Sequence, residues 1–220
     1  YETSETTGED RMNVAYLMAT AEEAGYPVEL IAMSQIGWDV AGDRVLFVPA
    51  PGQEHKAEPI DVIFMLYPWE WFWNEEGGKA FFRNMADPTK HGTVWIEPPY
   101  KAALLGNKAL LPVLWKLFGN DPERSKYLLP SYFAESTAGK AMTSYAKKPV
   151  WGREGGSVTL VRDGVTITEN PSEYGVDGRY IVQELAELPS FDGLEGTVHP
   201  VLGSWLIDGE PAGMGRDPLL

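Results

Sequence analysis

The chain has 220 residues, of which 44% are hydrophobic and 23% are charged, so it can bury a substantial core and is not globally disordered. Its formal net charge of −14 disfavours nucleic acid and anionic membrane surfaces as partners, because both repel an acidic protein. The absence of cysteine excludes disulfides and thiolate chemistry, and no apolar run approaches the ~20 residues of a membrane-spanning helix, so the sequence predicts a soluble cytoplasmic protein.

The first 90 residues predict a small α/β unit. Acidic Glu9 and Asp10 favour the start of a helix that Gly25 ends. We expect strands over residues 27–33, 45–48 and 61–66, with turns at 42–43 and 49–52. The last of these strands is a continuous apolar run, which is typical of a sheet buried on both faces.

An aromatic segment follows at residues 67–73, with five aromatic residues around Glu70. It indicates either the packing of a helix onto a sheet or a platform for a ligand, and packing is the favoured interpretation. We then expect a helix over 78–85, a strand over 93–97 and an amphipathic helix over 102–118. Pro112 lies inside that last run, where it should kink the helix or stand in the first turn of a second one.

The second part, to which we assign residues 91–220, predicts mainly antiparallel strands after its helices. Short strand-like pieces lie at 147–150, 157–161, 165–168, 179–185, 197–207 and 210–213. Asp163-Gly164 and Asp208-Gly209 stand between apolar runs and are typical of two-residue hairpin turns. The sequence therefore predicts an α/β (α+β) fold, with a small α/β unit followed by a helix-and-hairpin lobe.

Most candidate binding residues lie in one lysine- and glycine-rich segment. A lysine before a proline leads into a loop over residues 152–157, which runs into the next strand. Glycines expose successive N–H groups to phosphate oxygens, and a lysine adds a point charge. A plain glycine-rich hairpin explains the pattern equally well. The candidates are Lys148, Gly152, Arg153, Gly155, Gly156 and Ser157.

Four more candidates have weaker patterns. Gln183 and Glu184 end a strand and could offer partners to an adenine, or form an ordinary solvated strand end. Lys108 stands at the head of the amphipathic helix, where a cation opposes the helix dipole unless an anion lies near, and the alternative is a surface lysine. Arg216 follows a flexible glycine-rich turn and suits recognition of phosphate or carboxylate. The three histidines show no metal-ligand spacing, so we assign no metal ligand.

Further motifs run in order along almost the whole chain. They include Leu66-Tyr67-Pro68-Trp69-Glu70, Asn107-Lys108-Ala109-Leu110-Leu111-Pro112, Lys148-Pro149, Gly152-Arg153-Glu154-Gly155, Gln183-Glu184, Gly203-Ser204-Trp205 and Pro211-Ala212-Gly213-Met214-Gly215. Each is weak alone, but the collinear set resembles the glutathionylspermidine synthase family, whose synthetase domain has an ATP-grasp fold.

The resemblance implies an ATP-dependent ligase that joins a carboxylate to an amine through an acyl phosphate. In the family the carboxylate belongs to glutathione and the amine to spermidine, so a glutathione-like peptide and a polyamine are the implied partners, with ATP and Mg2+ as cofactors. By position, Lys108 and Lys148 resemble lysines that bind nucleotide phosphates, and residues 152–157 resemble the loop that closes over them. Gln183 and Glu184 fall in the adenine-side strand, and Arg216 resembles a catalytic arginine.

Two departures from the family pattern bear on activity. The acidic and asparagine motif that resembles the family's magnesium site has no match here, and the turn at Gly215-Arg216-Asp217 is one residue shorter than usual. We therefore expect a C-terminal ATP-grasp portion, truncated at both ends, whose Mg2+ ligands belong to a missing N-terminal portion. Such a chain should bind nucleotide weakly and turn over little.

The sequence leaves two rival hypotheses open. A catalytically inactive ATP-grasp-like module could keep the fold for binding or structure, and mutation of Lys108 or Lys148 would then change nothing. A carbohydrate-binding domain is suggested by eight tryptophans in an acidic chain, and it predicts exposed tryptophans. The ligase hypothesis instead buries most of them.

Overall fold

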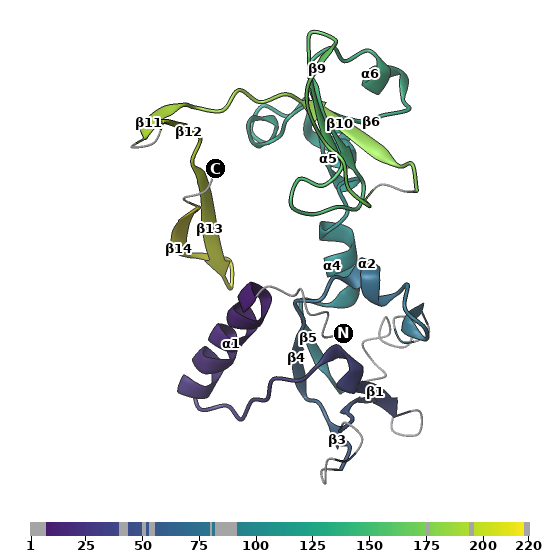
Figure 1. The fold of residues 1–220 in the computed structure, drawn as a ribbon, viewed down its shortest axis with the longest axis vertical. Helices are drawn as coiled ribbons and strands as arrows, with labels where there is room; N and C mark the ends of the chain where they lie inside the picture. Colours follow the sequence, from purple (N-terminus) through teal and green to yellow (C-terminus); the bar gives the residue numbers. More distant parts are fainter. Residues whose placement is uncertain are drawn as a thin grey trace. The chain divides into compact units, whose positions relative to one another are not determined.

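The computed structural model describes residues 8–39, 44–49, 52, 56–79, 81, 92–174, 177–193 and 196–217 (Figure 1). The chain divides into two compact units, Tyr1–Leu110 and Leu111–Leu220. The sequence predicts a different division, with a pre-ATP-grasp-like unit over residues 1–90 and a nucleotide-binding portion over residues 91–220. That division concerns function, and it stays a prediction.

The first unit begins with helix α1, Gly8–Glu23, as the acidic start and Gly25 predicted. Gly25 takes a φ of 87°, which only glycine adopts without steric cost, and the helix ends there. The strand expected over residues 27–33 is wrong. Residues 27–32 pair with no strand that the structure describes, and they lead into the short 3-10 helix η1, Met33–Gln35. An apolar run becomes a strand only where a neighbour completes its hydrogen bonds.

Two small sheets follow in this unit. Strands β1 (Ile36–Asp39), β2 (Arg44–Phe47) and β3 (Glu58–Pro59) form an antiparallel sheet in that order. Strand β4 (Val62–Phe64) pairs in parallel with β5 (Val94–Ile96). Burial of β4 on both faces is wrong: Ile63 is 7% exposed, whereas Val62 is 57% and Phe64 41% exposed, so only one face is covered.

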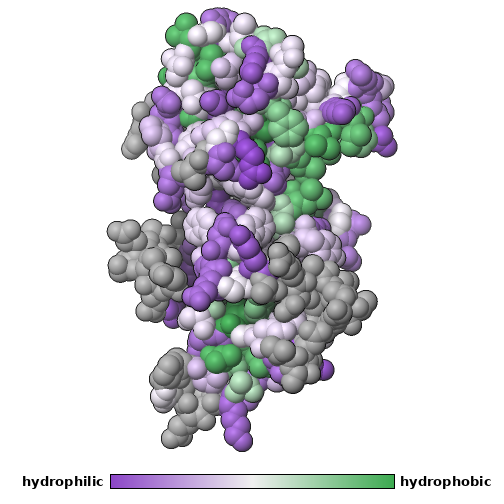
Figure 2. All heavy atoms as spheres, turned by 90° about the vertical axis from the view of Figure 1, so that its right-hand side faces the viewer, coloured by the Kyte–Doolittle hydropathy of each residue, from purple (hydrophilic) through white to green (hydrophobic). Residues whose placement is uncertain are grey.

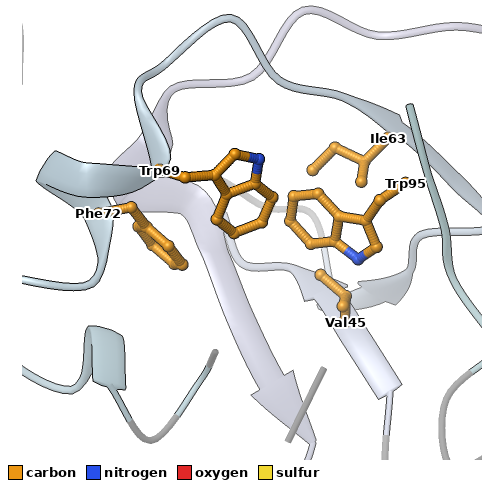
Figure 3. Packing of buried hydrophobic residues seen from close by; sticks show 5 residues of the cluster. All are labelled: Val45, Ile63, Trp69, Phe72 and Trp95. Carbon is orange, nitrogen blue, oxygen red and sulfur yellow. The ribbon is translucent and has the colours of Figure 1, made fainter. Parts of the chain in front are cut away.

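The aromatic segment supplies the core of this unit. Helix α2, Trp69–Phe72, places Trp69 and Phe72 in a buried cluster with Val45, Ile63 and Trp95 (Figure 3). The ring centroids of Trp69 and Trp95 lie 5.0 Å apart, a favourable packing distance for aromatic side chains. Within the described residues, the indole N–H of Trp95 is buried without a hydrogen-bond acceptor. Packing, rather than a ligand platform, is therefore the role of Trp69 and Phe72.

The expected long helix is two helices. Helix α4 spans Pro99–Leu105 and α5 spans Leu110–Phe118, so Pro112 lies in the first turn of the second helix, one of the two predicted outcomes. Of the helix expected over 78–85, Gly78, Lys79 and Phe81 are helical, and residues 82–85 lie outside the described residues.

The second unit contains a five-stranded antiparallel sheet in the order β6-β10-β7-β8-β9. The 3-10 helix η2 (Ser125–Tyr127) precedes it, and α6 (Thr137–Lys140) follows its first strand. Asp163 and Gly164 join β8 to β9 with φ of 50° and 79°, the paired positive values of the predicted hairpin turn. The strands are β6 (Ser131–Phe133), β7 (Tyr145–Pro149), β8 (Val158–Arg162), β9 (Val165–Asn170) and β10 (Tyr180–Glu184).

Two hairpins complete the chain, β11 (Phe191–Gly193) with β12 (Gly196–Val198), and β13 (Val201–Ile207) with β14 (Glu210–Asp217). Asp208-Gly209 makes the second predicted turn. The flexible turn expected around Gly213–Gly215 is wrong, because Gly213 and Gly215 pair with Trp205 and Gly203 inside the ladder. Backbone groups alone make such a ladder, so glycines do not interrupt it.

The exposure of the tryptophans favours the ligase hypothesis over the carbohydrate hypothesis, because most of them are not exposed. All eight lie in the described residues, and of these only Trp71 and Trp205 are exposed, at 42% and 66%. On the face shown in Figure 2, hydrophobic residues are interspersed with hydrophilic ones. The mixed α/β architecture is the predicted fold class.

Candidate functional site

The two adjacent lysines of β7 lie on opposite faces of the five-stranded sheet, because successive side chains of a strand alternate. Lys148 pairs with Ile181 of β10, and Ala146 pairs with Gln183, so these four residues share one face. Lys147 faces the other way. The order β6-β10-β7 thus brings Lys148 and Gln183 together, two candidates that are 35 residues apart in the sequence.

A hydrogen-bonded chain fixes the Lys148 side chain. Its Nζ donates to Oε1 of Gln183 at 2.8 Å, and Nε2 of Gln183 donates to Oγ of Ser131 at 3.1 Å. The Ser131 hydroxyl donates in turn to the carbonyl of Leu129 at 2.9 Å, and Ser131 is 1% exposed. The network spans three strands, so the position of the ammonium group is set by the fold rather than by solvent.

The electrostatics of Lys148 favour an anionic ligand. Burial lowers the pKa of its ammonium group, since desolvation disfavours the charged form. Within the described residues Lys148 forms no ion pair, and its hydrogen-bond acceptor is the neutral amide of Gln183. A half-buried cation with a neutral partner is stabilised by a nearby negative charge such as a phosphate.

The loop over residues 152–157 is tightly folded. Glu154, Gly155 and Ser157 take positive φ of 50°, 70° and 54°. Two turn hydrogen bonds join Gly156 N to Arg153 O at 2.8 Å and Val158 N to Gly155 O at 3.2 Å. Ser157 N donates to Asn170 O at 2.7 Å. The predicted presentation of successive N–H groups does not hold for residues 156–158, because these three already have acceptors within the protein.

A polar hollow of about 350 Å³ lies on the Lys147 side of the sheet. The Lys147 ammonium sits 4.6 Å from the centroid of the Tyr180 ring, a cation–π distance. Lys147, Thr159 and Glu169 form one row across β7, β8 and β9. Of the predicted residues, Ser157 lines this hollow, whereas Lys148 and Gln183 do not. The other lining residues are Asn170, Pro171, Ser172 and Tyr174.

Gly156→Ala tests the packing of this loop. A Cβ at Gly156 would lie 2.6 Å from Cδ2 of Tyr174 and 2.7 Å from Oγ of Ser172. We expect a loss of about 1–3 kcal/mol of unfolding free energy, measured by chemical denaturation, because the loop must shift to admit the methyl group. Gly203→Ala is the control, since a Cβ there meets nothing within 4 Å. Equal losses in the two variants would contradict this packing.

The remaining candidates lie elsewhere. Glu184 is exposed at the end of β10, and its N–H donates to Pro130 O at 2.8 Å. Lys108 belongs to the first unit, in the turn before α5, where the side chain of Asn107 accepts from Ala109 N at 2.8 Å. The backbone of Arg216 pairs with Leu202 in β14, and its side chain lies outside what the structure describes.

Sequence reasoning missed three residues that organise the site, Ser131, Asn170 and Ser172. Ser131 is buried beside Gln183 only because β6 pairs with β10, and no local pattern in the sequence predicts that pairing. Asn170 and Ser172 flank a proline after a strand, which reads as an ordinary turn.

Metal and membrane features are absent from the described residues. No group of three or more histidine or acidic side chains is placed to hold a metal ion there. The helices of that part are all too short or too polar to cross a membrane.

Three known proteins with similar sequences are named as ligases or synthetases. A putative acid–amine ligase of Haemophilus influenzae is 38% identical over 213 residues, which cover 94% of this chain and 48% of that protein. The bifunctional glutathionylspermidine synthetase/amidase of Escherichia coli is 23% identical over 84% of this chain and 30% of its own. The trypanothione synthetase of Crithidia fasciculata is 30% identical over 56% of this chain and 17% of its own.

The chain thus spans about half, or less, of the length of these curated relatives. The sequence profile of the glutathionylspermidine synthase preATP-grasp family matches residues 2–217. Because this match covers nearly every residue and the relatives are ligases and synthetases, the chain belongs to the glutathionylspermidine synthase preATP-grasp family.

Proposed function

We propose that this chain contributes nucleotide-binding residues to an ATP-dependent carboxylate–amine ligase. The half-buried Lys148 ammonium carries the proposal, because its hydrogen-bond acceptor is a neutral amide and its desolvation is offset best by an anion. Lys148 would bind a nucleotide phosphate, and Gln183 would hold the lysine in place. Gly152, Arg153, Gly155, Gly156 and Ser157 would cover the phosphates.

The proposed reaction has two steps. The carboxylate oxygen attacks the γ-phosphorus of ATP, the bond to the β-phosphate oxygen breaks, and an acyl phosphate and ADP result. The amine then attacks the acyl carbon, the new C–N bond forms, and inorganic phosphate leaves with the amine proton lost to solvent or a base. Cationic residues accelerate such a transfer by stabilising charge on the phosphoryl group, which is the role proposed for Lys148, and by family position for Lys108 and Arg216.

Mg2+ would screen the phosphates in such a reaction, but the described residues hold no cluster of three acidic side chains for it, so we assign it no ligand. The names of the relatives point to a glutathione-like peptide as the carboxylate substrate and a polyamine as the amine substrate. The net charge of −14 would attract a polycation weakly at long range. ADP release measured with glutathione and spermidine tests these substrates directly.

The affinity for nucleotide should fall at alkaline pH. Burial lowers the pKa of Lys148 from its ordinary value of 10.5, and only the protonated amine attracts a phosphate. The contribution of Lys148 to the affinity for Mg-ATP should therefore stay constant below that lowered pKa. It should fall as pH rises through the pKa. Titration calorimetry from pH 7 upward measures the effect. Lys148→Arg is the control, because a guanidinium stays charged over the whole range, and an equal fall in that variant would contradict the assignment.

A second candidate function is a non-catalytic binding or structural module of the same fold. It is favoured by the N–H groups of Gly156, Ser157 and Val158, which already have acceptors and leave less backbone free for phosphate. Nucleotide binding distinguishes the two functions. A ligase component binds Mg-ATP through Lys148. The module does not bind the nucleotide, and its properties do not change when that lysine is removed.

A further inference from the structure

The segment from Asn170 to Tyr174, here called the strap, is fastened to the glycine-rich loop. Nδ2 of Asn170 donates to the carbonyl of Gly155 at 3.0 Å. Oγ of Ser157 contacts Oγ of Ser172 at 2.9 Å and donates to the carbonyl of Ser172 at 3.1 Å. The Ser172 hydroxyl also accepts from the N–H of Tyr174 at 3.2 Å, which fixes the strap itself.

The backbone of the loop needs such support. Glu154 and Ser157 take positive φ without being glycines, which is an uncommon and unfavourable backbone conformation. The N–H of Ser157 donates to Asn170 O, and its hydroxyl contacts the hydroxyl of Ser172. The strap therefore holds both the backbone and the side chain of Ser157. Gly156 between them leaves room for Ser172 and Tyr174, since a Cβ would lie 2.7 Å and 2.6 Å from their atoms.

We propose that Ser172, together with Asn170, is a positioning residue that holds the loop over residues 152–157 in the shape that receives a nucleotide phosphate. Ser172 acts through Ser157 and the strap and does not itself bind the ligand. The inference rests on the proposed function for the identity of the ligand, but the claim about loop shape can be tested without any ligand.

Amide hydrogen exchange, followed by NMR on the labelled chain, tests the shape of the loop. In Ser172→Ala we expect exchange at the Ser157 amide to rise on the order of tenfold, because loss of the contact between the two serine hydroxyls weakens the hold of Ser157 against Asn170 O. The amides of Ile181 and Val182, buried in β10, should keep their rates. Ser144→Ala is the matched control: this serine also accepts one backbone N–H, from Asp163 at 3.0 Å, at the turn between two strands of the same sheet. Unchanged exchange at the Ser157 amide in Ser172→Ala would overturn the proposal. An equal rise at the Ser157 amide in Ser144→Ala would also overturn it.

The affinity for Mg-ATP tests whether the shape of the loop contributes to nucleotide binding. We expect Ser172→Ala to weaken binding about tenfold, and Ser172→Thr, which keeps the hydroxyl, to restore most of both the affinity and the slow exchange. Faster exchange with unchanged affinity would overturn the role in ligand binding. If the wild-type chain binds no Mg-ATP, the proposed function fails, while the exchange data still decide whether Ser172 positions the loop.

Discussion

Lys148→Ala should abolish the thermal stabilisation of this protein by Mg-ATP. A ligand at a hundred times its Kd adds about 2.7 kcal/mol to the unfolding free energy, which raises Tm by several degrees in a chain of this size. Removal of the ammonium takes away the charge that the phosphate would meet on that face of the sheet. Differential scanning fluorimetry with and without millimolar Mg-ATP measures the effect.

Lys147→Ala is the sharpest control that the chain offers. The two lysines are adjacent in β7 and point to opposite faces, so they share net charge and local backbone but not the candidate site. We expect Lys147→Ala to keep the stabilisation by Mg-ATP. If Lys147→Ala abolishes it and Lys148→Ala does not, the nucleotide binds on the side of the polar hollow, and the assignment to Lys148 is wrong.

Trp95→Ala should have the largest effect on stability. Trp95 is 4% exposed and packs against Trp69 in the core of the first unit (Figure 3). Replacement of a buried tryptophan by alanine typically costs about 3–5 kcal/mol, since apolar contacts are lost and a cavity remains. We expect the lower end of that range, because the mutation also removes a buried N–H that has no acceptor among the described residues. Denaturant unfolding followed by circular dichroism measures the loss.

Trp205→Ala provides the comparison for this prediction. Trp205 is 66% exposed in β13, and substitutions at such sites usually change stability by less than about 0.5 kcal/mol. Similar losses in Trp95→Ala and Trp205→Ala would mean that burial at Trp95 does not control the stability of the chain.

Local sequence signals predicted the features that depend on a few neighbouring residues. Asp163-Gly164 and Asp208-Gly209 form hairpin turns because positive φ at both positions is encoded by the dipeptide itself. Gly25 ends α1, and Pro112 stands in a first helical turn, for similarly local reasons. The strand expected over 27–33 failed because a strand needs a partner, and a single apolar segment carries no information about whether one exists.

The sequence named Lys148 and Gln183 as candidates, but it could not show that they are in contact. Their contact depends on β10 lying between β6 and β7. The same long-range pairing buries Ser131 beside them. The strap was also beyond local reasoning, because Ser172 meets Ser157 only after β8 and β9 have paired.

An NMR titration of the labelled chain with Mg-ATP tests most directly whether the Lys148 face of the sheet binds nucleotide. We expect chemical shifts to change at Lys148, Gln183 and the loop over residues 152–157, while Lys126 on the surface helix η2 stays unchanged. Changes at Lys147, Glu169 and Ser157 without changes at Lys148 and Gln183 would place the ligand in the polar hollow instead. No change at millimolar Mg-ATP would contradict nucleotide binding by this chain.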